Sequence, residues 1–257
     1  MTFTLDDNAG RLDNAQWVPS PNFGPRPETG DISLLVIHNI SLPPGQFGTG
    51  CVPRFFCNEL AANEHPYFEQ IADLQVSSHL LIERTGAVIQ FVDFRDRAWH
   101  AGRSSFDGRD NCNDYSIGIE LEGTDTEPYT DAQYDALTAV TRAIMAAYPD
   151  ITPARITGHE QIAPARKTDP GPAFDWLRYR QALVASSDES SADASDELPS
   201  ADYALTQGVT ADNVAAPDSG LKELGMEKSD LEEPGRDNSV ADNASADNTV
   251  ADKRKSQ

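Results

Sequence analysis

The chain has 257 residues, with 42 acidic against 20 basic side chains and a formal net charge of -22. Hydrophobic residues make up only 39% of it, and no apolar run approaches the ~20 residues of a membrane helix. Because this acidic balance leaves no basic patch for a phosphate backbone, the sequence predicts neither a membrane-spanning nor a nucleic-acid-binding protein.

The predicted elements begin with a β-branched, apolar run at residues 32–38, which is typical of a buried strand. A long loop rich in Pro and Gly follows at residues 41–63, and we expect it to cover a cleft and to move when substrate binds. Two apolar segments flanking Arg84-Thr85-Gly86 predict a hairpin over residues 78–92, and the alternation in residues 115–122 predicts another strand.

Residues 131–148 give the clearest helix pattern, with a capping box formed by Thr130 and Gln133, and a second short helix is expected from about Phe174 to Ala185. Strands interspersed with helices favour an α/β fold. We therefore expect residues 1–185 to form a single domain with a central mixed β-sheet flanked by helices.

Composition changes sharply at Ser186. Residues 186–257 hold 17 acidic and 6 basic residues and a single aromatic, Tyr203. Such a segment buries too little apolar surface to offset its ordering entropy, so we expect a disordered acidic tail at 186–257. It would serve as an interaction tail or, as we favour, a solubilising one; the sequence indicates no protein partner for it.

The cysteines and the N-terminal segment bear on the cellular compartment. Cys51, Cys57 and Cys112 match no disulfide framework or zinc ribbon, and the first residues lack the basic and apolar regions of a secretory signal. Both observations favour a cytoplasmic protein with reduced thiols.

Three separated polar residues suggest a metal site. His38 closes the first predicted strand, His159 follows Thr157-Gly158, and Asp169 lies in a stretch of Pro and Gly that cannot be regular structure. Two histidines and one carboxylate are a standard ligand set for catalytic zinc, with the fourth position left to water. Taken singly, each of these residues is more often structural.

Lys167 and two glutamates are candidates for the accompanying chemistry. Lys167 is the only lysine in residues 1–185, and an ammonium beside a metal could stabilise an oxyanion, although chance is the alternative. Glu120 and Glu122 lie on one face of their predicted strand, and either could act as a general base on an activated water. Their spacing does not distinguish them.

Five separated motifs then carry a family resemblance. They begin at Val36, Arg97, Cys112, Thr157 and Arg166, and read VIHNISLPPG, RAWHAG, CNDYSIGIELEGTDT, TGH and RKTDPGPAFDW. Over roughly residues 14–182 the chain resembles the AmpD-type 1,6-anhydro-N-acetylmuramyl-L-alanine amidases, which belong to a zinc amidase family that includes the peptidoglycan recognition proteins.

The resemblance implies a function and a role for each matching residue. It implies a cytoplasmic amidase with one Zn²⁺ per chain that cleaves between the lactyl group of 1,6-anhydro-N-acetylmuramic acid and L-alanine, in peptidoglycan recycling, with an indirect effect on β-lactamase induction. His38, His159 and Asp169 match the zinc ligands, Glu120 matches the catalytic glutamate rather than Glu122, and Lys167 matches the residue that assists at the oxyanion. Residues in segments that line or border the substrate cleft are Asn39, His65, Tyr67, His79, Trp99 and His100, with packing as the alternative for Tyr67 and Trp99.

The chain also departs from the resemblance. The family carries arginine at the positions of Gln75 and Asn111, where it is expected to reach the carboxylates of the stem peptide. Arg103 and Arg109 are nearby substitutes, so selectivity for the peptide stays open. Two other functions remain as alternatives: a binding module for wall fragments, which would lack part of the ligand set, and an amidase acting on polymeric wall outside the cytoplasm.

Overall fold

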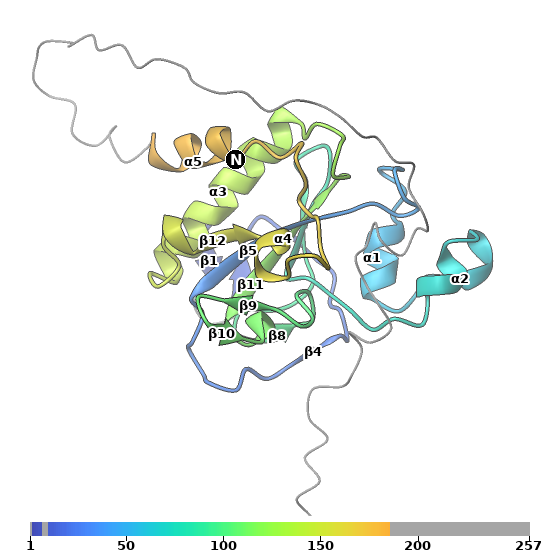
Figure 1. The fold of residues 1–257 in the computed structure, drawn as a ribbon, viewed down its shortest axis with the longest axis horizontal. Helices are drawn as coiled ribbons and strands as arrows, with labels where there is room; N and C mark the ends of the chain where they lie inside the picture. Colours follow the sequence, from blue (N-terminus) through green and yellow to red (C-terminus); the bar gives the residue numbers. More distant parts are fainter. Residues whose placement is uncertain (1, 7–9, 186–257) are drawn as a thin grey trace, which may run out of the picture.

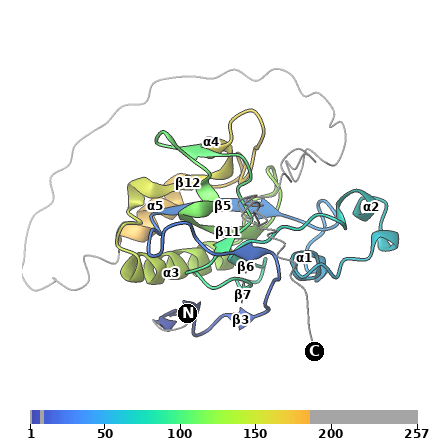
Figure 2. The same ribbon diagram turned by 90° about the horizontal axis from the view of Figure 1, so that it is seen from below.

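The computed structural model describes residues 2–6 and 10–185, so the acidic tail expected at 186–257 lies outside the described residues. A six-stranded mixed sheet forms the centre of the domain (Figure 1), in the order β12-β5-β11-β6-β7-β3, which can be followed in Figure 2. Four neighbouring strands are parallel, whereas β7 is antiparallel to β6 and β3 is parallel to β7. This arrangement confirms the expected α/β class. The strands are β3 (Gln16–Trp17), β5 (Leu34–Ile40), β6 (Leu80–Ile82), β7 (Val88–Gln90), β11 (Ser116–Glu122) and β12 (Ile156–Gly158).

The helices form two groups, and α3 of the first group covers one face of the sheet. In both views α3 (Asp131–Ala147) and α5 (Trp176–Val184) lie together, whereas α1 (Cys51–Phe56) and α2 (Phe68–Ile71) lie apart from them (Figures 1 and 2). Within the described residues no helix has both the length and the apolar character needed to cross a bilayer. The remaining short elements are α4 (His159–Ile162), three 3₁₀ turns (Ala62–Glu64, Cys112–Asp114, Pro153–Arg155) and three strand pairs: β1 (Leu5–Asp6) with β2 (Arg11–Leu12), β4 (Phe23–Gly24) with β8 (Arg97–Ala98), and β9 (Ser105–Phe106) with β10 (Arg109–Asp110).

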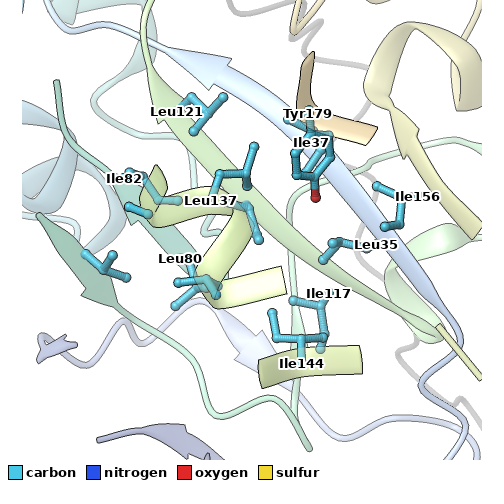
Figure 3. Close-up of a cluster of buried hydrophobic side chains, with 14 of the residues drawn as sticks. Leu35, Ile37, Leu80, Ile82, Ile117, Leu121, Leu137, Ile144, Ile156 and Tyr179 are labelled. Carbon is cyan, nitrogen blue, oxygen red and sulfur yellow. The ribbon is translucent and has the colours of Figure 1, made fainter. Parts of the chain in front are cut away.

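Strands β5 and β11 are buried on both faces, and this decides where their polar side chains can lie. Leu35 and Ile37 of β5 and Ile117 of β11 pack with Leu137 of α3 in the main hydrophobic core (Figure 3). Since successive strand residues point to opposite faces, the even-numbered residues of both strands lie on the face away from α3. Polar side chains on that second face are therefore enclosed by the rest of the domain.

Helix α3 is held in place at its start by the expected capping box. The Thr130 hydroxyl accepts from Gln133 N at 3.1 Å, and Gln133 Oε1 accepts from Thr130 N at 3.1 Å. The Gln133 amide also donates to Glu122 O at 2.9 Å, which ties the helix to the end of β11. The capping residues thus stabilise the helix and register it on the sheet. The expected hairpin (β6–β7) and second helix (α5) are likewise confirmed, and the three cysteines are free.

The segment at residues 41–63 differs from the expected loop. Residues 51–56 form α1, with Phe55 and Phe56 in a second hydrophobic cluster and no more than 2% exposed. Pro53 concealed this helix in the sequence, although proline is tolerated in a first helical turn. Because α1 is part of the core, the prediction of a mobile loop was wrong for residues 51–56; it stays a prediction for residues 41–50 and 57–63.

A buried arginine joins two separate main-chain segments. Arg26 donates to the main-chain oxygens of Phe94 (2.9 Å), Asp114 (3.1 Å) and Ser116 (2.9 Å), and its side chain is enclosed. Burial lowers the pKa of this guanidinium to about 10, so it remains a cation at neutral pH. Its hydrogen bonds connect the start of β11 to the turn after β7.

Arg26→Met is expected to lower the free energy of unfolding by about 3 kcal/mol, because it leaves several buried carbonyl groups without donors. Urea unfolding at neutral pH measures the change. The control is Arg95→Met: Arg95 is exposed and pairs with Asp93 at the surface, so its loss should change stability by less than about 1 kcal/mol. Equal losses in the two variants would show that the buried hydrogen bonds contribute nothing specific.

Candidate metal centre

Parallel pairing brings His38 and Glu120 side by side. β5 and β11 are parallel with Glu120 paired to His38, and both residues lie on the face away from α3. On the other side of β5, Gly158 of β12 pairs with Ile37, and His159 follows immediately as the first residue of α4. These side chains meet at the carboxyl ends of the parallel strands, where open α/β sheets place their sites.

Asp169 reaches the same place from an irregular loop. Its carbonyl oxygen accepts from Glu160 N at 2.9 Å, which ties the loop back to α4. On the far side Gly171 adopts a positive φ of 77°, and a Cβ there would lie 2.3 Å from the Cα of Asp125. Only glycine fits this close approach, so the loop position is set by main-chain contacts on both sides of Asp169.

Three potential ligand atoms form a compact triangle. His38 Nδ1 lies 2.9 Å from His159 Nδ1, and Asp169 Oδ2 lies 3.0 Å from the first and 3.1 Å from the second. All three residues are buried, and they are the one group of this kind among the residues that the structure describes. Ligands of a four-coordinate zinc lie about 3.3 Å apart, so these separations are within a few tenths of an ångström of such a site.

The hydrogen bonds of His159 test whether a cation fits. His159 Nε2 lies 3.1 Å from the carbonyl oxygen of Ala101, which can only accept, so this nitrogen carries a proton. A neutral His159 then presents its Nδ1 lone pair to the carboxylate oxygen of Asp169. Two lone pairs facing each other at 3.1 Å are the donors that a divalent cation binds jointly, and the residue set therefore fits zinc.

The pKa shifts of Asp169 and His38 also fit a metal site. Burial alone would raise the pKa of Asp169, but the adjacent His159 and His38 hold the pKa of this carboxyl well below its usual range. Burial and the neighbouring His159 lower the pKa of His38. A carboxylate and a neutral imidazole are the protonation states in which these side chains bind a metal.

Glu120 combines burial with an open oxygen. Its Oε2 is buried and has no hydrogen-bond partner among the described residues. Burial raises the pKa of Glu120 to about 7, with opposing effects from His38 and Asp169, and Lys167 lies close enough to lower it. A carboxyl group that titrates near neutral pH can both accept and return a proton. Lys167 is itself only 7% exposed.

Glu122 occupies the same face of β11 but is fully engaged. Its Oε1 accepts from Gly48 N at 2.6 Å and its Oε2 accepts from Arg84 N at 3.2 Å. These contacts join the loop after β5 and the hairpin turn to the end of β11. The two glutamates that spacing left equivalent thus differ in their hydrogen bonding: both oxygens of Glu122 accept a main-chain N–H, whereas Glu120 Oε2 has no partner among the described residues.

The residues expected near the substrate have diverse surroundings, and their role stays a prediction. His79 is fully buried, with Nδ1 accepting from Gly118 N and Nε2 lying 3.1 Å from the Asp96 carbonyl oxygen, so it offers no surface to a ligand. Asn39 donates to Asp125 Oδ1 at 2.9 Å, and Tyr67 is buried in the second hydrophobic cluster. His65, Trp99 and His100 are partly exposed.

The positions that depart from the family resemblance lie at the surface. Gln75 and Asn111 are both exposed. Of the two nearby arginines, Arg109 pairs with Asp31 and stacks 3.9 Å from the centre of the Tyr115 ring, whereas Arg103 is exposed. Arg103 is thus the better candidate for a carboxylate of the stem peptide.

Two residues that contact the segment around His100 were missed from the sequence. Asn113 accepts from the main-chain N–H groups of His100 and Ala101 through its Oδ1, and Ser116 Oγ lies 3.0 Å from His100 Nε2. Both lie within a motif that carried the family resemblance, but their spacing gives no sign that they contact a segment more than ten residues earlier.

The chain matches a family of known enzymes. Residues 28–172 match the family described as N-acetylmuramoyl-L-alanine amidase. The 1,6-anhydro-N-acetylmuramyl-L-alanine amidase AmpD of Citrobacter freundii is 56% identical over 178 residues, which cover 69% of this chain and 95% of the relative. The protein of the same name from Escherichia coli K12 is 57% identical over 171 residues, covering 66% and 93%.

A solved structure agrees with these sequence relatives. The crystal structure of a selenomethionine derivative of AmpD, 56% identical, superposes with a TM-score of 0.67 and covers 68% of this chain and 97% of the other. The similarity therefore extends over almost the whole length of these relatives and over the part of the chain that contains the candidate metal centre.

Proposed function

The chain belongs to the N-acetylmuramoyl-L-alanine amidase family, and from that premise we propose that it hydrolyses the amide bond between the lactyl group of 1,6-anhydro-N-acetylmuramic acid and L-alanine. The observation that carries the proposal is the triangle of His38, His159 and Asp169 with the open oxygen of Glu120 beside it. A binding module would need neither the complete ligand set nor a buried carboxylate without a partner.

Zinc is the metal that we assign to this site. His38 and His159 would hold it through Nδ1, and Asp169 through Oδ2. Bound zinc supplies Lewis acidity, which polarises a carbonyl and makes water more acidic. The donor set of two imidazoles and one carboxylate is the type found in catalytic zinc sites.

Glu120 moves the proton in this reaction. Its Oε2 takes a proton from the attacking water and then gives it to the nitrogen of the leaving L-alanine amine. The pKa of about 7 suits both steps, since the group exists in both protonation states near neutral pH. A base that stayed permanently ionised would return the proton poorly.

Lys167 stabilises the charge that develops on the carbonyl oxygen. Its ammonium group lies near Glu120, in a buried position where a charge interaction is stronger than in water. His65, Trp99 and Arg103 are the exposed or partly exposed groups that we assign to the sugar and the peptide of the substrate. The enzyme acts on soluble anhydro-muramyl fragments in the cytoplasm, in peptidoglycan recycling, which also limits the inducers of β-lactamase.

Metal removal and substrate choice test this function together. The purified full chain is assayed on 1,6-anhydro-N-acetylmuramyl peptide and on intact sacculi, before and after treatment with a chelator. We expect release of the peptide from the small substrate, loss of activity in chelator, and recovery on addition of Zn²⁺.

Other outcomes identify the alternatives. Binding of the muramyl peptide without release of free peptide would indicate a binding module. Equal specific activity on sacculi would indicate an enzyme of the polymeric wall. Full activity after exhaustive chelation would contradict the metal mechanism.

A further inference from the structure

The distal nitrogens of the two histidine ligands meet the same two consecutive residues. His38 Nε2 lies 2.9 Å from His100 Nδ1, and His159 Nε2 lies 3.1 Å from the carbonyl oxygen of Ala101. The proximal nitrogens of both rings point into the triangle with Asp169. Residues 100 and 101 are thus the common support of two ligands that are 121 positions apart in the chain.

The directions of these hydrogen bonds follow from the ligand role. An imidazole that binds a cation through Nδ1 keeps its proton on Nε2 and must donate it. His100 Nδ1 then has to accept from His38, which places the proton of a neutral His100 on Nε2. That nitrogen lies 3.0 Å from Ser116 Oγ, which can accept it. Each hydrogen bond from His38 through His100 to Ser116 thus has one donor and one acceptor.

Residues 100 and 101 are themselves held in place by hydrogen bonds and by packing. The Oδ1 of Asn113 accepts from the main-chain N–H groups of both His100 (3.0 Å) and Ala101 (2.8 Å), and Asn113 is only 6% exposed. The His100 ring packs against the main chain of β11 at Gly118, where a Cβ would lie 2.6 Å from the ring. The ring therefore has one position, and a glycine in mid-strand provides the space for it.

From this geometry we propose that His100 and Asn113 are positioning residues of the metal centre: His100 orients His38 through its ring, and Asn113 holds the main chain that presents acceptors to both histidine ligands. The inference rests on the proposed function, because it concerns the same site. It assigns His100 to the metal rather than to the substrate, since both of its ring nitrogens are engaged within the protein.

Two substitutions of His100 separate this role from packing. In the full chain, the dissociation constant for Zn²⁺ is measured by competition with a chromophoric chelator. His100→Leu removes the acceptor and should weaken zinc binding about 10–100-fold, whereas His100→Asn, whose Oδ1 can lie near the position of Nδ1, should stay within about threefold of wild type. Long-range ¹H–¹⁵N spectra of the zinc-loaded wild type should show His100 protonated on Nε2.

Thr141→Val controls for loss of stability alone. It removes the buried hydrogen bond between Thr141 Oγ1 and Tyr179 OH (2.7 Å) in the α3–α5 region, so the midpoint of thermal unfolding should fall while zinc affinity stays unchanged. Unaltered zinc affinity in His100→Leu, equal weakening in His100→Asn, or a proton on His100 Nδ1 would overturn the inference. A wild-type chain that binds no zinc would overturn the proposed function as well, which distinguishes the two failures.

Discussion

Asp169→Asn is expected to lower the zinc affinity of the full chain by about 10²–10³-fold and to leave no measurable amidase activity. The substitution keeps the shape of the side chain but removes the negative charge that faces His38 and His159 at 3.0 and 3.1 Å. Zinc titration gives the affinity. At a zinc concentration 100 times the dissociation constant of the wild type, zinc should raise the free energy of unfolding of the wild type by about 2.7 kcal/mol. The same zinc concentration should raise that of the variant by almost nothing.

Asp175→Asn is the matched control for this change. Asp175 caps α5, with its Oδ1 accepting from Arg178 N at 2.9 Å, and asparagine caps helices about as well as aspartate. Zinc affinity and activity should therefore equal those of the wild type. If Asp169→Asn also retained wild-type zinc affinity, the assignment of the ligand triangle would be wrong.

Glu120→Gln is expected to lower the turnover rate by about 10²–10⁴-fold while zinc content stays complete. The amide can neither take a proton from water nor return one to the leaving amine. Glu122→Gln is the control, because Glu122 lies on the same face of β11 but binds only main-chain N–H groups. It should retain most of the activity; a similar loss in both variants would argue against a specific role for Glu120.

The same Glu120→Gln substitution, which should lower turnover, should raise the free energy of unfolding of the metal-free chain. Burial raises the pKa of Glu120 from its ordinary value to about 7, so in the metal-free chain the unfolded state ionises first and stability falls as pH rises through that range. Removing the ionisable group should stabilise the metal-free variant by about 1–3 kcal/mol at pH 8, with a much smaller difference at pH 4. Denaturant unfolding at the two pH values measures this, and a variant less stable at pH 8 would contradict it.

The sequence predicted the elements whose signal is local. The apolar run that became β5, the hairpin at Arg84-Thr85-Gly86 and the capping box of α3 each depend on neighbouring residues, and the structure has all three. Helix α1 was missed because its six residues give too short a period and contain Pro53. Its stability comes from tertiary burial of Phe55 and Phe56, which no local pattern reports.

For the candidate site, too, some residues could be predicted from the sequence and others could not. Residue type and position at strand ends, together with the family resemblance, were enough to select His38, His159 and Asp169, which the structure brings together. The choice between Glu120 and Glu122 depends on which carboxylate finds main-chain donors, and the role of Asn113 depends on a turn folded against residues 100–101. Such contacts are three-dimensional, so spacing alone could not have predicted them.

The separation of the two histidine ligands also affects when the protein becomes functional. His38 enters the chain early, but its partners at positions 159 and 169 are made near the end of the domain, so a chain emerging from the ribosome has no complete ligand set until almost the whole sheet can assemble. Closing so long a segment is a slow step because the entropy is lost before the contacts form. Capture of the metal ion would therefore follow assembly of the sheet, and chains truncated before Asp169 would not hold zinc through this site.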